Sequence, residues 1–170
     1  RAVELDSNFA AAILDLYPLY RNTGANEKAM QLIKKLIELK PDCTKKDQFE
    51  IDLFEANLNN DDLKFLETLE QCRIQFPEDR DAYMRMADLY RRWNSPKAEI
   101  QYLEKILTID PNYKVAYNRL GYANANEGNF DKAIEAIHRY MELAPEEANP
   151  YDSAGEIYLL SGEYDKAEQY

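Results

Sequence analysis

Four prolines divide this chain at a nearly constant interval. Pro41, Pro77, Pro111 and Pro145 follow one another at intervals of about 34 residues, and Ser7 lies one more such interval before the first. We call this interval one period. A fixed period in the thirties is typical of stacked helix pairs, in which each pair buries its apolar side only against its neighbours. The period therefore predicts an all-α repeat array that displays a continuous groove.

The unit that ends at Pro145 carries the clearest motif. An aromatic residue, a Leu-Gly pair and an alanine precede the proline, as Tyr117, Leu120, Gly121, Ala133 and Pro145. This pattern resembles the tetratricopeptide repeat, whose first helix carries an aromatic, Leu-Gly and a second aromatic, and whose second helix carries Ala, an aromatic and a closing Pro. Asn124 and Ile137 replace the second and third aromatic residues, which weakens one packing contact without moving the register.

The resemblance covers essentially the whole chain. It implies a right-handed α-solenoid of stacked antiparallel helix pairs, with about four full repeats and a partial unit at each end. The repeats are expected over residues 10–43, 44–79, 80–113 and 114–147, with a partial repeat over 148–170 and the end of a preceding repeat over 1–7. The half-units at the two ends are expected to leave apolar faces uncovered and to allow weak end-to-end self-association.

Two of these units depart from the pattern. In the unit 80–113, Pro96 and Ala98 indicate a turn that is shifted by about one residue. The unit 44–79 is divergent, because Asp52 and Leu53 stand where Leu-Gly is expected and because its period is two residues longer. We expect the extra residues near Thr44, with a local change of curvature.

The glycines fit the same fold. Gly121 and Gly155 occupy the place where the two helices of a unit approach closely, while Gly24, Gly128 and Gly162 lie in the turn between them. Glycine ends helices readily because it tolerates a positive φ. Since the repeat accounts for all five glycines, none remains for a phosphate-binding loop or a dinucleotide fingerprint.

Charge and hydropathy limit the partners. The formal net charge is −11, from 21 basic and 32 acidic residues, which disfavours nucleic acid and anionic membranes. No apolar run of about 18 residues and no signal peptide are visible, so we expect no membrane insertion and a cytoplasmic location. Because the chain begins within a repeat, an upstream signal or anchor could precede it.

Nothing in the sequence indicates chemistry. His138 is the only histidine, and no nucleophile or ligand cluster accompanies it. Acidic pairs such as Asp61-Asp62 and Glu146-Glu147 are typical of helix caps. We therefore expect no catalytic residue, no metal site and no cofactor, and hence a protein that is not an enzyme.

The resemblance implies that the first helices of the repeats line the concave surface. The groove residues would be those interleaved with the packing positions: Arg85, Asp88, Arg92, Asn118, Arg119, Tyr122, Asn126, Asp152 and Glu156. Arg85 and Arg119 lie one period apart, so they should be aligned and could hold a carboxylate or phosphate. The alternative is that the arginines pair with Asp81 or Asp88 at helical spacing and only solubilise the groove.

Two functions from different classes follow. The first is a non-catalytic scaffold or adaptor whose groove binds another protein, either as a helix or as an extended acidic peptide. The second is the regulatory or sensory region of a larger bacterial signalling protein, such as a kinase, a nucleotide cyclase or a transcriptional regulator. The genes that flank the coding sequence would distinguish them.

Overall fold

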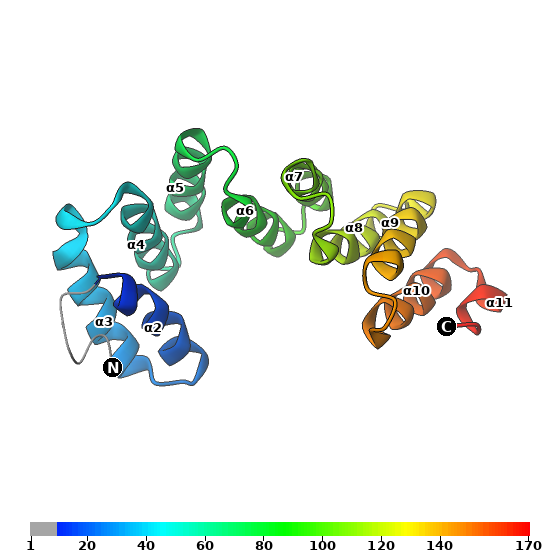
Figure 1. Cartoon of the computed structure of the whole chain (residues 1–170), viewed down its shortest axis with the longest axis horizontal. Helices are drawn as coiled ribbons and strands as arrows, with labels where there is room; N and C mark the ends of the chain where they lie inside the picture. Colours follow the sequence, from blue (N-terminus) through cyan, green and yellow to red (C-terminus); the bar gives the residue numbers. More distant parts are fainter. Residues whose placement is uncertain (1–9) are drawn as a thin grey trace. The chain divides into compact units, whose positions relative to one another are not determined.

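A computed structural model of the chain describes residues 10–170, which form ten α-helices and no strand. The chain divides into two compact units, at Pro77 and Glu78, and each is built from antiparallel helix pairs (Figure 1). The all-α prediction is thus confirmed. The repeat end predicted over residues 1–7 lies outside the described residues, and the repeat boundaries within the array stay a prediction.

The first unit contains four helices. They are α2 (Ala10–Asn22), α3 (Asn26–Leu39), α4 (Lys45–Leu58) and α5 (Asp62–Gln75), with a 3₁₀ turn at Lys40–Asp42 after α3. Apolar residues three and four positions apart bring one face of each helix inward. They form a buried cluster of Ile13, Tyr17, Ala29, Ile33, Leu36 and Ile51.

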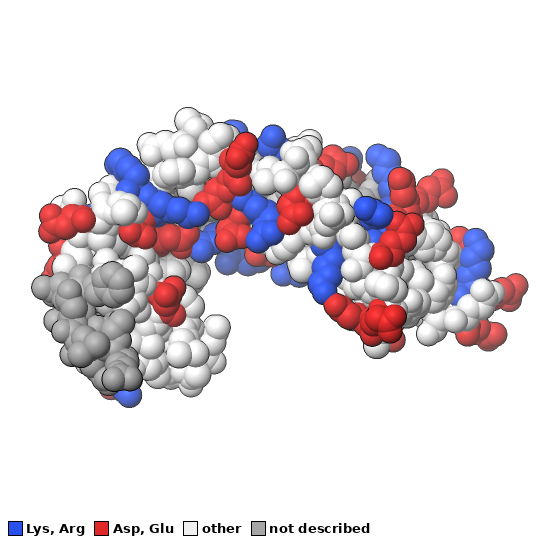
Figure 2. All heavy atoms as spheres, viewed as in Figure 1, with Lys and Arg blue, Asp and Glu red and all other residues white. Residues whose placement is uncertain are grey.

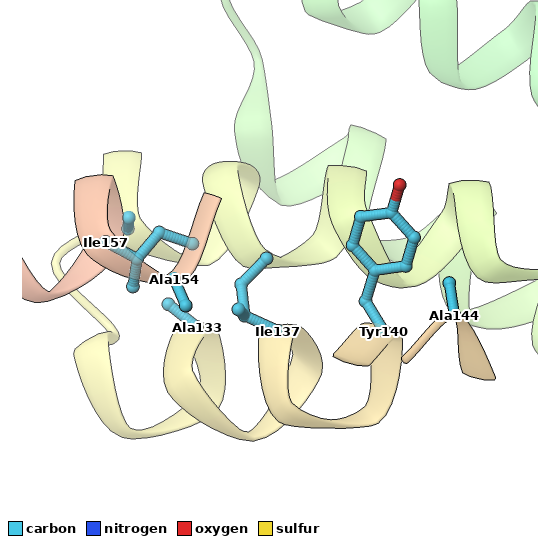
Figure 3. Packing of buried hydrophobic residues seen from close by; sticks show 7 residues of the cluster. Ala133, Ile137, Tyr140, Ala144, Ala154 and Ile157 are labelled. Carbon is cyan, nitrogen blue, oxygen red and sulfur yellow. The ribbon is translucent and has the colours of Figure 1, made fainter. Parts of the chain in front are cut away.

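The second unit contains the remaining six helices: α6 (Arg80–Arg92), α7 (Pro96–Ile109), α8 (Lys114–Asn126), α9 (Phe130–Leu143), α10 (Ala148–Ser161) and α11 (Tyr164–Ala167). Figure 3 shows the core between α8, α9 and α10. In it, α9 contributes Ala133, Ile137 and Tyr140 at helical spacing, and α10 contributes Ala154 and Ile157. The core alternates small and large residues, so consecutive helices interlock along the chain.

The turn within each pair has one backbone conformation throughout. The residues with positive φ are Gly24 (75°), Asn60 (53°), Asn94 (51°), Gly128 (77°) and Gly162 (82°). They recur once per period, with the first interval two residues longer than the others, and all follow the first helix of a pair. Asparagine is the residue after glycine that visits the left-handed region most readily. Asn60 and Asn94 therefore replace glycine in the turn, which the sequence pattern did not indicate.

The turn shift expected in the unit 80–113 was wrong. Asn94 lies one period before Gly128, and α7 begins at Pro96, one period before the start of α9 at Phe130. Pro96 is not a turn residue but stands in the first turn of α7, where its fixed φ suits a helix and its missing N–H costs nothing. In the unshifted register Glu99, and not Ala98, occupies the place of Ala133.

We expect the left-handed turn to matter for stability. Asn94→Ala and Gly128→Ala should each lower the free energy of unfolding by about 1–2 kcal/mol, because a Cβ disfavours positive φ. A Cβ at Gly128 would meet no atom within 4 Å, so conformation alone sets its cost. Urea denaturation measures both losses. Asn94→Gly is the control and should cost nothing; an unchanged midpoint for Asn94→Ala would contradict the interpretation.

The two extra residues of the divergent unit are divided between a linker and a helix. Five residues separate α3 from α4, whereas four separate α7 from α8, and α4 has 14 residues against 13 in α6 and α8. Thr44 caps α4, since its side chain accepts a hydrogen bond from the backbone N–H of Asp47 at 3.2 Å. The left-handed turn at Asn60 then restores the common geometry.

Candidate functional site

The first helices of the second unit bring part of the predicted site together. Arg119 on α8 contacts Asp88 on α6, and the Tyr122 hydroxyl donates a hydrogen bond to Glu156 on α10. Four of the nine predicted groove residues thus connect three helices through side chains. We call the nine predicted residues on α6, α8 and α10 the α8 face, because α8 contacts both neighbours.

Arg119 is held by two carboxylates. Its Nη1 lies 2.6 Å from Asp88 Oδ1, and its Nη2 lies 2.7 Å from Glu99 Oε1, which also accepts from Nε at 3.2 Å. The side chains of Arg119 and Glu99 are 15% and 6% exposed. A forked guanidinium is the cation best suited to such a site, because its planar donors reach two acceptors at once.

Glu99 is the residue that sequence analysis missed. It stands one period before Ala133, at a place where the repeat pattern expects a small residue on the second helix. A carboxylate buried there needs a cationic partner, because removing an isolated charge from water costs many kcal/mol. In the unshifted register, Glu99 stands where the repeat pattern expects alanine, and Arg119 lies on the next helix. This combination would have indicated the ion pair.

This arrangement changes the role expected for Arg119. The most buried partner of Arg119 is Glu99, which lies on the second helix of the preceding pair. The sequence had instead suggested an aspartate at helical spacing. Asp88 is shared, since Arg91 approaches its Oδ1 at 3.6 Å. Arg119 therefore acts first as a structural tie between α6, α7 and α8.

The other predicted residues differ in exposure. Asn118 is half-buried, and its Oδ1 is a buried atom that has no hydrogen-bond partner among the described residues. Asn126, Asp152 and Glu156 are exposed. Arg85 is half-buried and Arg92 exposed, and both interact with other groups of the chain. The Asn118 oxygen is thus the group on this face that most needs a donor.

Charge is finely mixed on this molecule. Figure 2 shows basic and acidic side chains interspersed on the visible face. On the α8 face, burial raises the pKa of Tyr122, and the hydrogen bond to Glu156 raises it further. The phenol therefore keeps its proton at neutral pH and donates a hydrogen bond to the Glu156 carboxylate. Within residues 10–170, no group of three or more His, Cys, Asp and Glu side chains is placed to hold a metal ion.

A helix that crosses a bilayer needs about 20 consecutive residues that are mostly apolar. Between residues 10 and 170, no helix combines the necessary length and apolarity.

The helix pairs, their common turn and the shared apolar positions define a helical-repeat scaffold. Comparison with family models gives the same result: one tetratricopeptide repeat model matches residues 102–135, and a second matches residues 19–43 and 81–113. The chain belongs to the tetratricopeptide repeat family.

Solved structures support this fold. The chain is similar to PilW, a type IV pilus biogenesis factor, with a TM-score of 0.80 and 17% identity over 99% of this chain and 78% of PilW. It is similar to MamA from Desulfovibrio magneticus RS-1, with a TM-score of 0.71 and 19% identity over 94% and 89% of the two chains. It is also similar to YrrB, a TPR protein with an unusual peptide-binding site, with a TM-score of 0.65 and 20% identity over 99% and 86%. No curated protein sequence gives a significant match.

Proposed function

We propose that the chain binds a segment of another protein along the α8 face. Membership of the tetratricopeptide repeat family supports a role as a protein-interaction scaffold, because stacked repeats create extended surfaces for partners. The peptide-binding site named for YrrB, a protein of similar fold, agrees with this role. The finer proposal, which concerns the residues of one face, rests on the side chains of α8.

The observation that carries the proposal is the buried oxygen of Asn118. An acceptor that is buried without a partner costs about 1–3 kcal/mol. Because Asn118 as a residue is only half-buried, rotation of its side chain toward a ligand donor would recover this energy. Backbone N–H groups of an extended peptide are such donors. Asn118, Tyr122 and Asn126 lie four residues apart, so they form a row about 12 Å long on one side of α8.

The neighbouring helices set the charge of the ligand. Asp152 and Glu156 on α10 give one side of the row an acidic edge, while Arg85 and Arg92 on α6 give the other side two guanidinium groups. Arg119 is neutralised by Asp88 and Glu99. Arg85 and Arg92 also interact with other groups of the chain, and an acidic ligand would share these two guanidinium groups with their present partners. We therefore propose an extended segment with acidic residues at the end that meets α6.

A peptide-display selection against the whole chain tests this proposal. Peptides selected on the parent protein should bind the Asn118→Ala, Asn126→Ala double variant about tenfold more weakly, because hot-spot contacts at an interface are worth more than about 1 kcal/mol each. Fluorescence anisotropy measures the affinity. The matched control is Asn57→Ala, Asn129→Ala, which removes two exposed amides elsewhere.

Equal affinity for the parent and for the α8-face variant would refute the site. Arg85→Gln, Arg92→Gln tests the acidic end separately: the selected peptides should lose affinity, and should lose less of it in about 0.5 M salt, where exposed charges are screened. Peptides that bind this variant as tightly as the parent would refute the acidic ligand but not the α8 face.

A further inference from the structure

Two stacked pairs of tyrosine rings occupy the same place in the repeat. The rings of Tyr90 and Tyr102 lie 5.3 Å apart at 14°, and those of Tyr158 and Tyr170 lie 5.7 Å apart at 6°. The pair between them is missing. Asn124 lies one period after Tyr90 and one period before Tyr158, and Ala136 stands in the same relation to Tyr102 and Tyr170. One repeat thus carries an amide and a methyl group where its neighbours carry two rings.

A cavity of about 760 Å³ lies at this place. Its lining includes Leu120 and Asn124 from α8, Ala136 from α9, and Glu104 from α7. Asn124 is 5% exposed and Ala136 is 8% exposed, so they form a buried floor, while exposed charged side chains such as Glu104 and Glu142 surround the mouth. This volume falls within the range of about 300–1,000 Å³ that is usual for ligand pockets.

The repeat symmetry also indicates what a ring in this cavity would meet. The hydroxyl of Tyr158 lies 2.9 Å from His138 Nε2 on the preceding second helix. The residue one period before His138 is Glu104, which lines the cavity. A phenol that occupied the place of the missing ring would direct its hydroxyl toward this carboxylate, which accepts a hydrogen bond. Asn124 uses one of its amide hydrogens on the Leu120 carbonyl at 2.9 Å, so the amide is oriented.

The shape of the cavity favours a polypeptide over a free small molecule. Its lining on α9 runs from Asp131 to Glu142, which corresponds to about 16 Å of helix. One ring fills only part of that length, and an extended chain would occupy the rest. Around the cavity the carboxylates of Glu104, Asp131, Glu135 and Glu142 outnumber the cations of Lys132 and Arg139, which favours basic residues beside the ring.

We propose that this cavity binds a tyrosine side chain from a basic segment of a partner protein. The site lies between α7, α8 and α9 and uses a different row of α8 residues from the α8 face, so it stands independently of the function proposed above. The tyrosine ring would take the place of the missing pair between Asn124 and Ala136, and its hydroxyl would donate to Glu104.

The test is a titration of the isotope-labelled chain, followed by NMR. The probes are N-acetyl-tyrosinamide, N-acetyl-phenylalaninamide and the peptide acetyl-Lys-Ser-Tyr-Ser-Lys-amide. We expect the peptide to shift the Asn124 side-chain amide and the Ala136 methyl signals, and to bind about tenfold more tightly than N-acetyl-tyrosinamide. The tyrosine probe should bind about fivefold more tightly than the phenylalanine probe, and Glu104→Ala should abolish this preference.

Asn124→Tyr should abolish peptide binding, because it restores a ring in the cavity. Val115→Tyr adds the same side chain at an exposed residue of the same helix that belongs to neither proposed site, and should leave binding unchanged. If Asn124→Tyr does not fold, Glu104→Ala alone carries the test, since Glu104 is exposed.

Any of four results with the probes would overturn the proposal. They are an absence of shifts up to about 10 mM of the tyrosine probe, equal binding to the Asn124→Tyr variant, equal binding of the peptide and N-acetyl-tyrosinamide, and no preference for tyrosine over phenylalanine. Shifts of the same two signals when the protein is concentrated without a probe would assign the cavity to a second copy of this chain, and would also overturn it.

Discussion

Replacing Arg119 by methionine is expected to lower the free energy of unfolding by about 3–5 kcal/mol, which is the usual cost of breaking a buried ion pair from one side. The loss arises chiefly at Glu99. Its side chain is 6% exposed and accepts hydrogen bonds from Arg119 Nη2 and Nε, so the variant leaves a carboxylate in the interior without its cation. Urea denaturation followed by circular dichroism gives the change in free energy directly.

Two further variants decide whether the ion pair is the cause. Glu99→Ala combined with Arg119→Met restores the small residue found at Ala133 and should recover most of the stability, because a buried pair removed as a whole often costs little. Arg91→Met removes an exposed arginine that approaches the same Asp88, and should cost less than about 1 kcal/mol. A double variant as unstable as Arg119→Met would show that lost packing, and not the unpaired charge, explains the effect.

The second large effect is expected at Gly121. A Cβ at this residue would lie 2.6 and 2.7 Å from Cδ1 and Cγ1 of Ile137, and 2.9 Å from Cδ1 of Ile157. Both isoleucines are 1% exposed, so they have little room to move. Gly121→Ala should therefore cost about 1–3 kcal/mol through overpacking, although alanine is the better helix former. The midpoint of urea unfolding measures this loss.

Gly155 provides the matched control, because it occupies the same place one repeat later. A Cβ there would approach no described atom closer than 3.6 Å, at Tyr170. Gly155→Ala should be neutral or stabilising by up to about 1 kcal/mol, since the helix gains from the loss of glycine. Ile137→Val in the Gly121→Ala background should relieve part of the strain. Equal effects at both glycines would contradict a cost set by packing against Ile137.

The sequence was sufficient to predict the class of fold and the helix pairs, because a fixed period and an apolar face are properties of the chain itself. It also placed Gly24, Gly128 and Gly162 in turns. It did not reveal the left-handed turns at Asn60 and Asn94, because asparagine occurs in many other conformations. The shifted turn proposed from Pro96 was wrong because a proline fits a turn and the first turn of a helix equally well.

The candidate site was predicted less completely than the fold. The repeat register predicted Arg119 and Asp88 for the same groove, but the partner of a long side chain depends on which neighbouring helix it can reach. Glu99 lies 20 residues earlier in the chain, and only the packing of α7 against α8 brings the two together. The cavity beside Asn124 was equally hidden, because the sequence shows a missing ring but not whether neighbouring side chains move in to fill its space.

The tie between Glu99 and Arg119 has a consequence for how such an array can grow. The unit 80–113 carries an acid on its second helix that needs an arginine from the following unit, and its own first helix offers Arg85 at the position equivalent to Arg119. A tandem copy of this unit would therefore supply its predecessor with the required arginine and present a new acid to its successor. The left-handed turns would keep the common period through the added copy. Gene duplication of this segment would therefore lengthen the array without leaving the buried acid of either copy unpaired.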